Sequence, residues 1–114
     1  MDWEEDIKEK LGAVNVEIVK REIRNGKINN DKLKELANCM HKEVYGDFIH
    51  NERQGHNLVY LFRKMLDCWY NKSLCVKSKS NEDAQTEFRS LLQEVELNAI
   101  AQKITISQSV QSER

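Results

Sequence analysis

The side chains best able to do chemistry in this sequence are three histidines and three cysteines, and their spacing matches no known reactive pattern. Cys39 and His41 lie two residues apart, and His50 and His56 lie six apart. The sequence has no Cys-x2-Cys pair and no His-Glu-x2-His, the spacings at which zinc ligands and metalloprotease sites recur. Its four glycines are isolated, so it has no phosphate-binding loop. We therefore expect no enzymatic activity, no metal or other cofactor, and no small-molecule substrate.

The cysteines are more easily explained as packing groups than as nucleophiles. Cys39 lies beside a stripe of apolar residues and Cys68 precedes Trp69, so we expect both thiols to act as small apolar groups in or near a core. With Cys75, the three thiols cannot all pair within the chain, which favours reduced cysteines and a cytoplasmic location. The acidic start MDWEEDIKEK does not resemble a signal peptide. No apolar run approaches the ~18 residues of a membrane span, so we expect no membrane insertion.

The elements that position these side chains are predicted to be helices. The chain has 114 residues, with 39% hydrophobic and 32% charged, no proline and four glycines. This length and composition predict one domain with one core, and the scarcity of helix breakers favours helices. We see no alternation of the kind that predicts a strand.

Apolar residues at every third or fourth position predict six helical segments. The first covers 3–24, with Ile7, Leu11, Val14 and Ile18 on one face; Gly12 can divide it, and Asn25-Gly26 ends it. The second begins after the capping group Asn29-Asn30-Asp31 and is expected to end at Gly46. A short third helix follows from Asp47 to Arg53, ended by Gln54-Gly55.

The second half of the chain carries the strongest pattern. Residues 57–71 form a wide apolar stripe, typical of a helix in the middle of a bundle. Residues 72–81 have no such period and are predicted to be an exposed loop, with Ser80 capping the fifth helix. A last short helix is expected with Asn98 as its cap. From Thr105 onward the chain is polar and is expected to be frayed.

These segments predict an all-α fold, an antiparallel bundle of six helices. Its parts are the N-terminal helical segment 1–27, the remainder of the same bundle at 28–104, and a polar tail at 105–114. Such a bundle should be monomeric at low concentration and self-associate weakly.

Two oppositely charged stretches distinguish the surface. Residues 20–34 hold six basic residues against two acidic ones, a net charge of +4, and residues 82–96 hold five acidic residues against one basic one, a net charge of −4. The whole chain has a net charge of −1, so a general affinity for nucleic acid is not expected. Opposed charged faces suit docking to another protein or to a second copy. Two alternatives stay open: ordinary solvated faces, and a helical nucleic-acid-binding domain that uses residues 20–34.

From the second helix onward, the sequence resembles a death domain. The stretch KLKELANCM, with Leu36-Ala37, resembles the second helix of that family, and GDFIHNER resembles the short third helix. LVYLFRKMLDCWYNKS resembles the fourth, through its Leu66-x2-Trp69 element. AQTEFRSLLQEVELNAIAQKI resembles the fifth and sixth, ending in Leu97-x3-Ala101. The tryptophan common near the start of the second helix is absent here and the first helix matches weakly, so a caspase-recruitment or death-effector relative stays open.

The resemblance implies a death-fold bundle that is a non-catalytic interaction module. Death domains bind other death domains and assemble signalling complexes in apoptosis and innate immunity, often as open head-to-tail assemblies. Two contact types of the family nominate surface residues here. The third helix against the first two helices of a neighbour nominates Asp47, Glu52 and Arg53 opposite Lys20, Arg24 and Lys27. The loop after the fourth helix against the start of the sixth nominates Lys72, Lys77 and Lys79 opposite Glu94 and Glu96.

Overall fold

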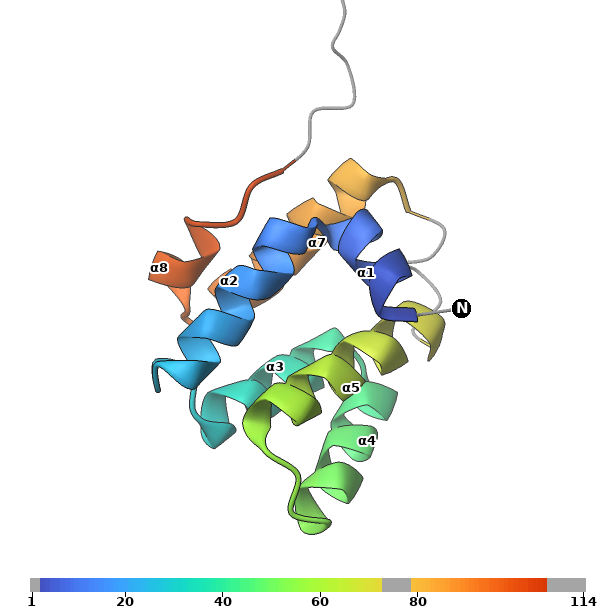
Figure 1. The fold of residues 1–114 in the computed structure, drawn as a ribbon, viewed down its shortest axis with the longest axis vertical. Helices are drawn as coiled ribbons and strands as arrows, with labels where there is room; N and C mark the ends of the chain where they lie inside the picture. The colour runs from blue at the N-terminus through green and yellow to red at the C-terminus, as the bar shows by residue number, and fades with distance from the viewer. Residues whose placement is uncertain (1–2, 73–78, 107–114) are drawn as a thin grey trace, which may run out of the picture.

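The computed structural model describes residues 3–72 and 79–106, and in these residues the chain is built from helices (Figure 1). The helices are α1 (Trp3–Leu11), α2 (Ala13–Arg24), α3 (Asn30–Met40), α4 (Lys42–Arg53), α5 (Leu58–Lys72), α7 (Asn81–Glu94) and α8 (Asn98–Ala101). The described part contains no strand, which confirms the all-α prediction. None of the helices in this part combines the length and the apolar character needed to cross a membrane.

The first predicted segment is broken at Gly12, and the break turns the second half of the segment. Gly12 has φ 93°, a conformation that L side chains rarely adopt, and α1 and α2 diverge from it (Figure 1). After the break, α2 buries Val16, Val19 and Ile23. The prediction that Val14 shares the buried face of Ile7 and Leu11 is wrong, because that face does not continue across Gly12. Val14 is 66% exposed.

The next helix boundary also differs from the prediction. The second helix was expected to end at Gly46, but α3 ends at Met40 and α4 runs through Gly46 to Arg53. The break occurs at His41, whose backbone is extended (φ −177°, ψ 150°). His41 begins the new helix, because its Nδ1 accepts a hydrogen bond of 3.1 Å from the backbone N–H of Glu43. The third helix of the bundle is therefore longer than the sequence pattern indicated.

The other helix ends mostly follow the predicted signals. Asn29 caps α3 by accepting from the Lys32 N–H at 2.9 Å, and Ser80 caps α7 by accepting from the Asp83 N–H at 3.1 Å. Asn98 was predicted to cap the last helix and does not, since α8 begins at Asn98 itself after Leu97. Most of the predicted loop at 72–81 lies outside the described residues.

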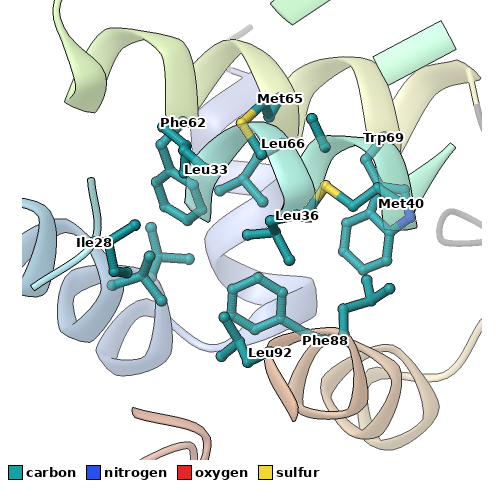
Figure 2. Packing of buried hydrophobic residues seen from close by; sticks show 14 of the residues in the cluster. Ile28, Leu33, Leu36, Met40, Phe62, Met65, Leu66, Trp69, Phe88 and Leu92 are labelled. Carbon is teal, nitrogen blue, oxygen red and sulfur yellow. The ribbon is translucent and has the colours of Figure 1, made fainter. Parts of the chain in front are cut away.

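The core lies where α3, α5 and α7 face one another (Figure 2). Leu36 of α3, Leu66 of α5 and Phe88 of α7 are buried and point into the same space. The rings of Trp69 and Phe88 lie 6.2 Å apart between centroids and are tilted by 35°, within the range of favourable aromatic pairs. Around this centre α4 packs on α3 and α5, α1 packs on α5 and α7, and α8 packs on α2 and α7.

Two glycine substitutions should have effects of opposite sign. Gly46→Ala should raise the free energy of unfolding by about 0.5–1 kcal/mol, because Gly46 lies inside α4 with no atom within 4 Å of an added Cβ. Gly12→Ala should lower it by about 1–3 kcal/mol, because of the positive φ and a Cβ only 3.0 Å from Nδ2 of Asn15. Urea denaturation of both variants measures the difference. If Gly46→Ala is as destabilising as Gly12→Ala, α4 does not run through Gly46.

Candidate interaction surfaces

The basic end of α2, which we define as Arg24 and Lys27, is exposed. Lys20, nominated with them, is only 6% exposed and lies on the buried side of α2. Its Nζ lies 3.9 Å from a carboxylate oxygen of Glu17. Lys20 therefore presents little surface to a partner, and Arg24 and Lys27 are the cations that a docking protein would meet.

Arg24 also lines a cleft between the end of α2 and the start of α5, with a volume of about 520 Å³. Asn57 lies at the rim of this cleft, and its side-chain oxygen accepts a hydrogen bond of 2.8 Å from the backbone N–H of Tyr60 in the first turn of α5. The Tyr60 ring lies against His56, with centroids 4.1 Å apart. We call this hollow the Arg24 cleft; it is lined by Ile23, Arg24, Asn57, Leu58, Val59, Tyr60 and Arg63. It combines apolar walls with two arginines, so it suits a segment that carries both apolar and acidic side chains.

The nominated acids of α4 are bound by amides rather than by cations. Asn51 donates to Oδ2 of Asp47 at 3.2 Å, and Asn30 donates to Oε2 of Glu52 at 2.5 Å. An amide donor holds a carboxylate in place and, unlike a lysine or an arginine, brings no positive charge to it. Arg53 is exposed at the end of the same helix.

The bond between Asn30 and Glu52 also locates the two nominated groups relative to each other. Asn30 begins α3, three residues after Lys27, and Glu52 lies at the end of α4. The structure therefore brings Glu52 to the same end of the bundle as the α2–α3 connection, whereas Asp47 lies in the middle of α4.

The second nominated set is only partly described. Lys79 forms an ion pair with Glu87 at 3.3 Å, and its carbonyl accepts from Nζ of Lys10 at 2.6 Å. Lys72 is the last residue of α5, and its side chain lies outside the described residues, as does the whole of Lys77. Lys79 is thus an anchor for the start of α7, and its charge is already compensated within the molecule.

Glu94 is the last residue of α7 and Glu96 lies two residues after it, and both are exposed. A helix of 14 residues is about 21 Å long, so these acids and Lys79 are separated within one molecule. Cys39 lies near Glu94 and is exposed, so the prediction of a buried thiol is wrong for Cys39, although it is confirmed for Cys68. Desolvation of its sulfur, and then the carboxylates of Glu94 and Glu35, raise the pKa of Cys39. A raised pKa disfavours the thiolate, so Cys39 lacks the activation of a nucleophile.

The basic stretch 20–34 is less continuous in space than in sequence. Lys20 is buried, and Nζ of Lys32 donates to the carbonyl of Val95 at 2.7 Å and lies 3.6 Å from a carboxylate oxygen of Glu35. These contacts reduce the basic surface that the alternative nucleic-acid function would need, because binding to phosphates depends on exposed cations.

The sequence did not reveal that the segment after α8 is fastened to α2. Asn15, 2% exposed, accepts from the N–H of Thr105 at 2.8 Å and donates to the Thr105 carbonyl at 2.7 Å. Thr105 is therefore held by two hydrogen bonds, and the prediction of fraying from this residue onward is wrong at its first position. Lys103 donates to Glu22 at 2.9 Å, and this hydrogen bond lowers the pKa of Glu22. The sequence did contain one sign of a buried polar contact, because Asn15 is a polar residue between two valines.

Comparison with known proteins gives no family for the chain. No family model, no curated protein and no solved structure matches it. Within the described residues, no group of histidine, cysteine, aspartate and glutamate side chains could hold a metal ion. A function must therefore be argued from the arrangement of the helices and from the surfaces above.

Proposed function

We propose that this domain is a non-catalytic protein–protein interaction module of the death-fold type, which assembles signalling complexes of apoptosis or innate immunity by contacts with other death domains. The observation that carries the proposal is the burial of the residues on which the family resemblance rests. Leu36 and Ala37 of α3, Leu66 and Trp69 of α5, and Leu97 and Ala101 near the end are all buried. The residues that carry the resemblance are thus core positions of a helical bundle. Proteins that share a fold are expected to resemble one another at such positions.

The packing of the helices gives further support. The first helical segment, broken into α1 and α2, packs against α5, α7 and α8, while α3 packs against α4, α5 and α7. The first and last elements of the chain therefore lie together in the bundle (Figure 1). A helical bundle in which the first and last helices pack together agrees with the fold that the resemblance implies.

The surface provides what an open head-to-tail contact needs. The basic end of α2 and the Arg24 cleft offer cations beside apolar walls, and Asp47 and Glu52 of α4 offer carboxylates held by amides. Opposite charges on two different surfaces fix the register of a neighbour and speed its approach. The two groups consist of different residues, so the contact would be heterologous, the type from which open head-to-tail assemblies are built.

Reversing the charge of the basic end of α2 should weaken binding without unfolding the domain. We expect Arg24→Glu/Lys27→Glu to lower affinity about tenfold or more, or ~1.4 kcal/mol, for a purified death domain that the parent chain binds. Exposed charge reversals usually change the free energy of unfolding by less than about 0.5 kcal/mol. Calorimetric titration against a panel of purified death domains, with urea melts of each variant, measures both quantities.

The matched control is Lys42→Glu/Lys64→Glu, which makes the same change in net charge on α4 and α5, at an exposed and a half-buried lysine that do not line the Arg24 cleft. The control should bind like the parent. If both double variants bind like the parent, the basic end of α2 is not part of the interface. If no death domain binds and the chain instead binds random duplex DNA with a steep loss of affinity as salt rises, the nucleic-acid alternative replaces the proposal.

A further inference from the structure

The Arg24 cleft brings two arginines from different helices to one hollow. Arg24 is the last residue of α2 and Arg63 lies in the second turn of α5, yet both line the cleft. None of the described residues that line it is an aspartate or a glutamate. The lining therefore carries two positive charges and no carboxylate, and a hollow lined by charges of one sign attracts ligands of the opposite sign.

The side chain of Arg24 is available to such a ligand. It is exposed, and its guanidinium forms no hydrogen bond or salt bridge with any described residue. Arg63 is half-buried in the wall of the same cleft. A guanidinium group is planar and presents its N–H donors at fixed positions, so it can bind two oxygens of one phosphate at once. The two arginines together can therefore bind a single oxyanion from two sides.

The size and the walls of the cleft indicate that the anion is attached to an apolar group. The volume of about 520 Å³ lies within the range of about 300–1,000 Å³ that is usual for ligand sites, and a phosphate alone would fill little of it. Arginine side chains also pack flat against aromatic rings. An aromatic ring that carries an oxyanion therefore suits the cleft better than a free anion does. The apolar walls are formed by Ile23, Leu58, Val59 and the ring of Tyr60.

A phosphate monoester matches this lining more closely than a carboxylate or a nucleotide. Near pH 7 the phosphoryl group carries a charge of about −1.5 to −2 and three acceptor oxygens, which suits two guanidinium groups, whereas a carboxylate carries a single charge. A nucleotide would also need hydrogen-bond partners for the edges of its base. The one side-chain carbonyl of the lining, that of Asn57, already accepts from the backbone N–H of Tyr60.

We propose that the Arg24 cleft binds a phosphate monoester carried on an aromatic ring, as in a phosphorylated tyrosine side chain of a partner protein. The phosphate is bound by Arg24 and Arg63, and the ring packs on the apolar walls. Arginine clusters recognise phosphorylated segments in this way in several kinds of binding module.

The inference goes beyond the proposed function and does not rest on it, because a phosphorylated segment can belong to a partner that is not a death domain. Its consequence is a contact that forms only after the partner has been phosphorylated. An unmodified tyrosine brings the ring to the cleft but leaves both arginines without an anion.

Titration of the full chain with phenyl phosphate, followed by heteronuclear NMR of the backbone amides, tests the proposal. The amides of Leu58, Val59 and Tyr60 should shift and saturate with a Kd of about 1 mM or lower. Inorganic phosphate should bind about tenfold more weakly, because it buries no apolar surface on the walls. Benzoate should also bind about tenfold more weakly, because it keeps the ring but carries a single negative charge.

Three variants locate the binding site. Arg24→Gln should weaken the binding of phenyl phosphate about tenfold, because it removes one of the two charge-assisted contacts. Arg63→Lys should weaken it severalfold, because lysine keeps the charge but cannot bind two oxygens with one planar group. Arg21→Gln is the matched control, since it removes the same charge from an exposed position of α2 that does not line the cleft, and it should bind like the parent. Urea melts show that each variant is folded.

The absence of saturable shifts with phenyl phosphate, or equal weakening by Arg24→Gln and Arg21→Gln, overturns the proposal. Inorganic phosphate that binds as tightly as phenyl phosphate would make the cleft a site for free anions, and benzoate that does so would make it a site for acidic side chains. Adenosine monophosphate that binds more tightly than phenyl phosphate would make it a nucleotide site. The proposed function is tested separately by death domains that carry no phosphate, so either proposal can fail while the other holds.

Discussion

Trp69→Ala should lower the free energy of unfolding by about 3–5 kcal/mol, the usual cost of truncating a buried aromatic side chain. Trp69 is 1% exposed on α5, and its ring faces that of Phe88 on α7 (Figure 2). The substitution therefore removes a contact between two helices and leaves a cavity between them. A domain of this size usually has about 5–15 kcal/mol in total, so the variant should be close to unfolded at room temperature.

Urea denaturation followed by circular dichroism measures this loss. Trp69→Phe is the matched variant, since it keeps an aromatic ring against Phe88 and should lose much less. Tyr45→Ala, at a half-buried position of α4, shows the cost of removing a ring outside the centre of the core. A midpoint for Trp69→Ala within error of the parent's would mean that Trp69 is not a core residue, and the main support for the death-fold proposal would be lost.

Asn15→Ala should lower the free energy of unfolding by about 1–3 kcal/mol, because it leaves buried or half-buried polar groups without partners. The side-chain amide of Asn15 donates to the carbonyls of Leu11 and Thr105, both at 2.7 Å, and its oxygen accepts from the Thr105 N–H. Alanine can replace none of these bonds. The segment after α8 should then detach from α2 more often than the rest of the bundle opens.

Hydrogen exchange at the Thr105 amide, measured together with a urea melt, tests this expectation. Exchange should speed up at Thr105 more than in α5. Asn98→Ala is the control, since Asn98 is exposed at the start of α8 and its side chain caps nothing. Equal effects of the two substitutions would mean that Asn15 does not hold the segment.

Helix α5 was predictable because its apolar residues recur at the spacing that places them on one face of a helix. In residues 57–71, Leu61, Phe62, Met65, Leu66 and Trp69 recur at helical spacing, and all are buried on α5. Capping residues were equally informative at Asn29 and Ser80, where the side chain bonds to a backbone N–H three residues on. These signals are local, so the sequence carries them without reference to the rest of the fold.

The two wrong helix assignments have a common physical cause. Apolar periodicity locates a helix but does not report where its phase changes. At Gly12 the phase changes, and the buried set after it is Val16, Val19 and Ile23 rather than Val14 and Ile18. At His41 a single extended residue separates two helices, although histidine has no strong preference for such a position. Gly46, five residues later, does not interrupt the helix.

The candidate surfaces were predictable in charge but not in exposure. Arg24, Lys27, Glu94 and Glu96 are exposed as expected, whereas Lys20 is buried by its place on the inner side of α2. The bonds of Asn15 to Thr105 and of Glu22 to Lys103 join residues 90 and 81 positions apart. No local pattern can indicate pairs so distant in sequence.

The distance between those bonded residues bears on how the domain is made. Helices α3, α4 and α5 contact one another in sequence and can pack as soon as they are synthesised. Helices α1 and α2 also pack against α7 and α8, the last elements described. Bringing segments so far apart in sequence together lowers the conformational entropy of the chain before the contacts between them form. Of the described helices, α1 and α2 are thus synthesised first but are among the last to be fixed. A nascent chain interrupted before α8 would leave one side of α2 uncovered and open to chaperones.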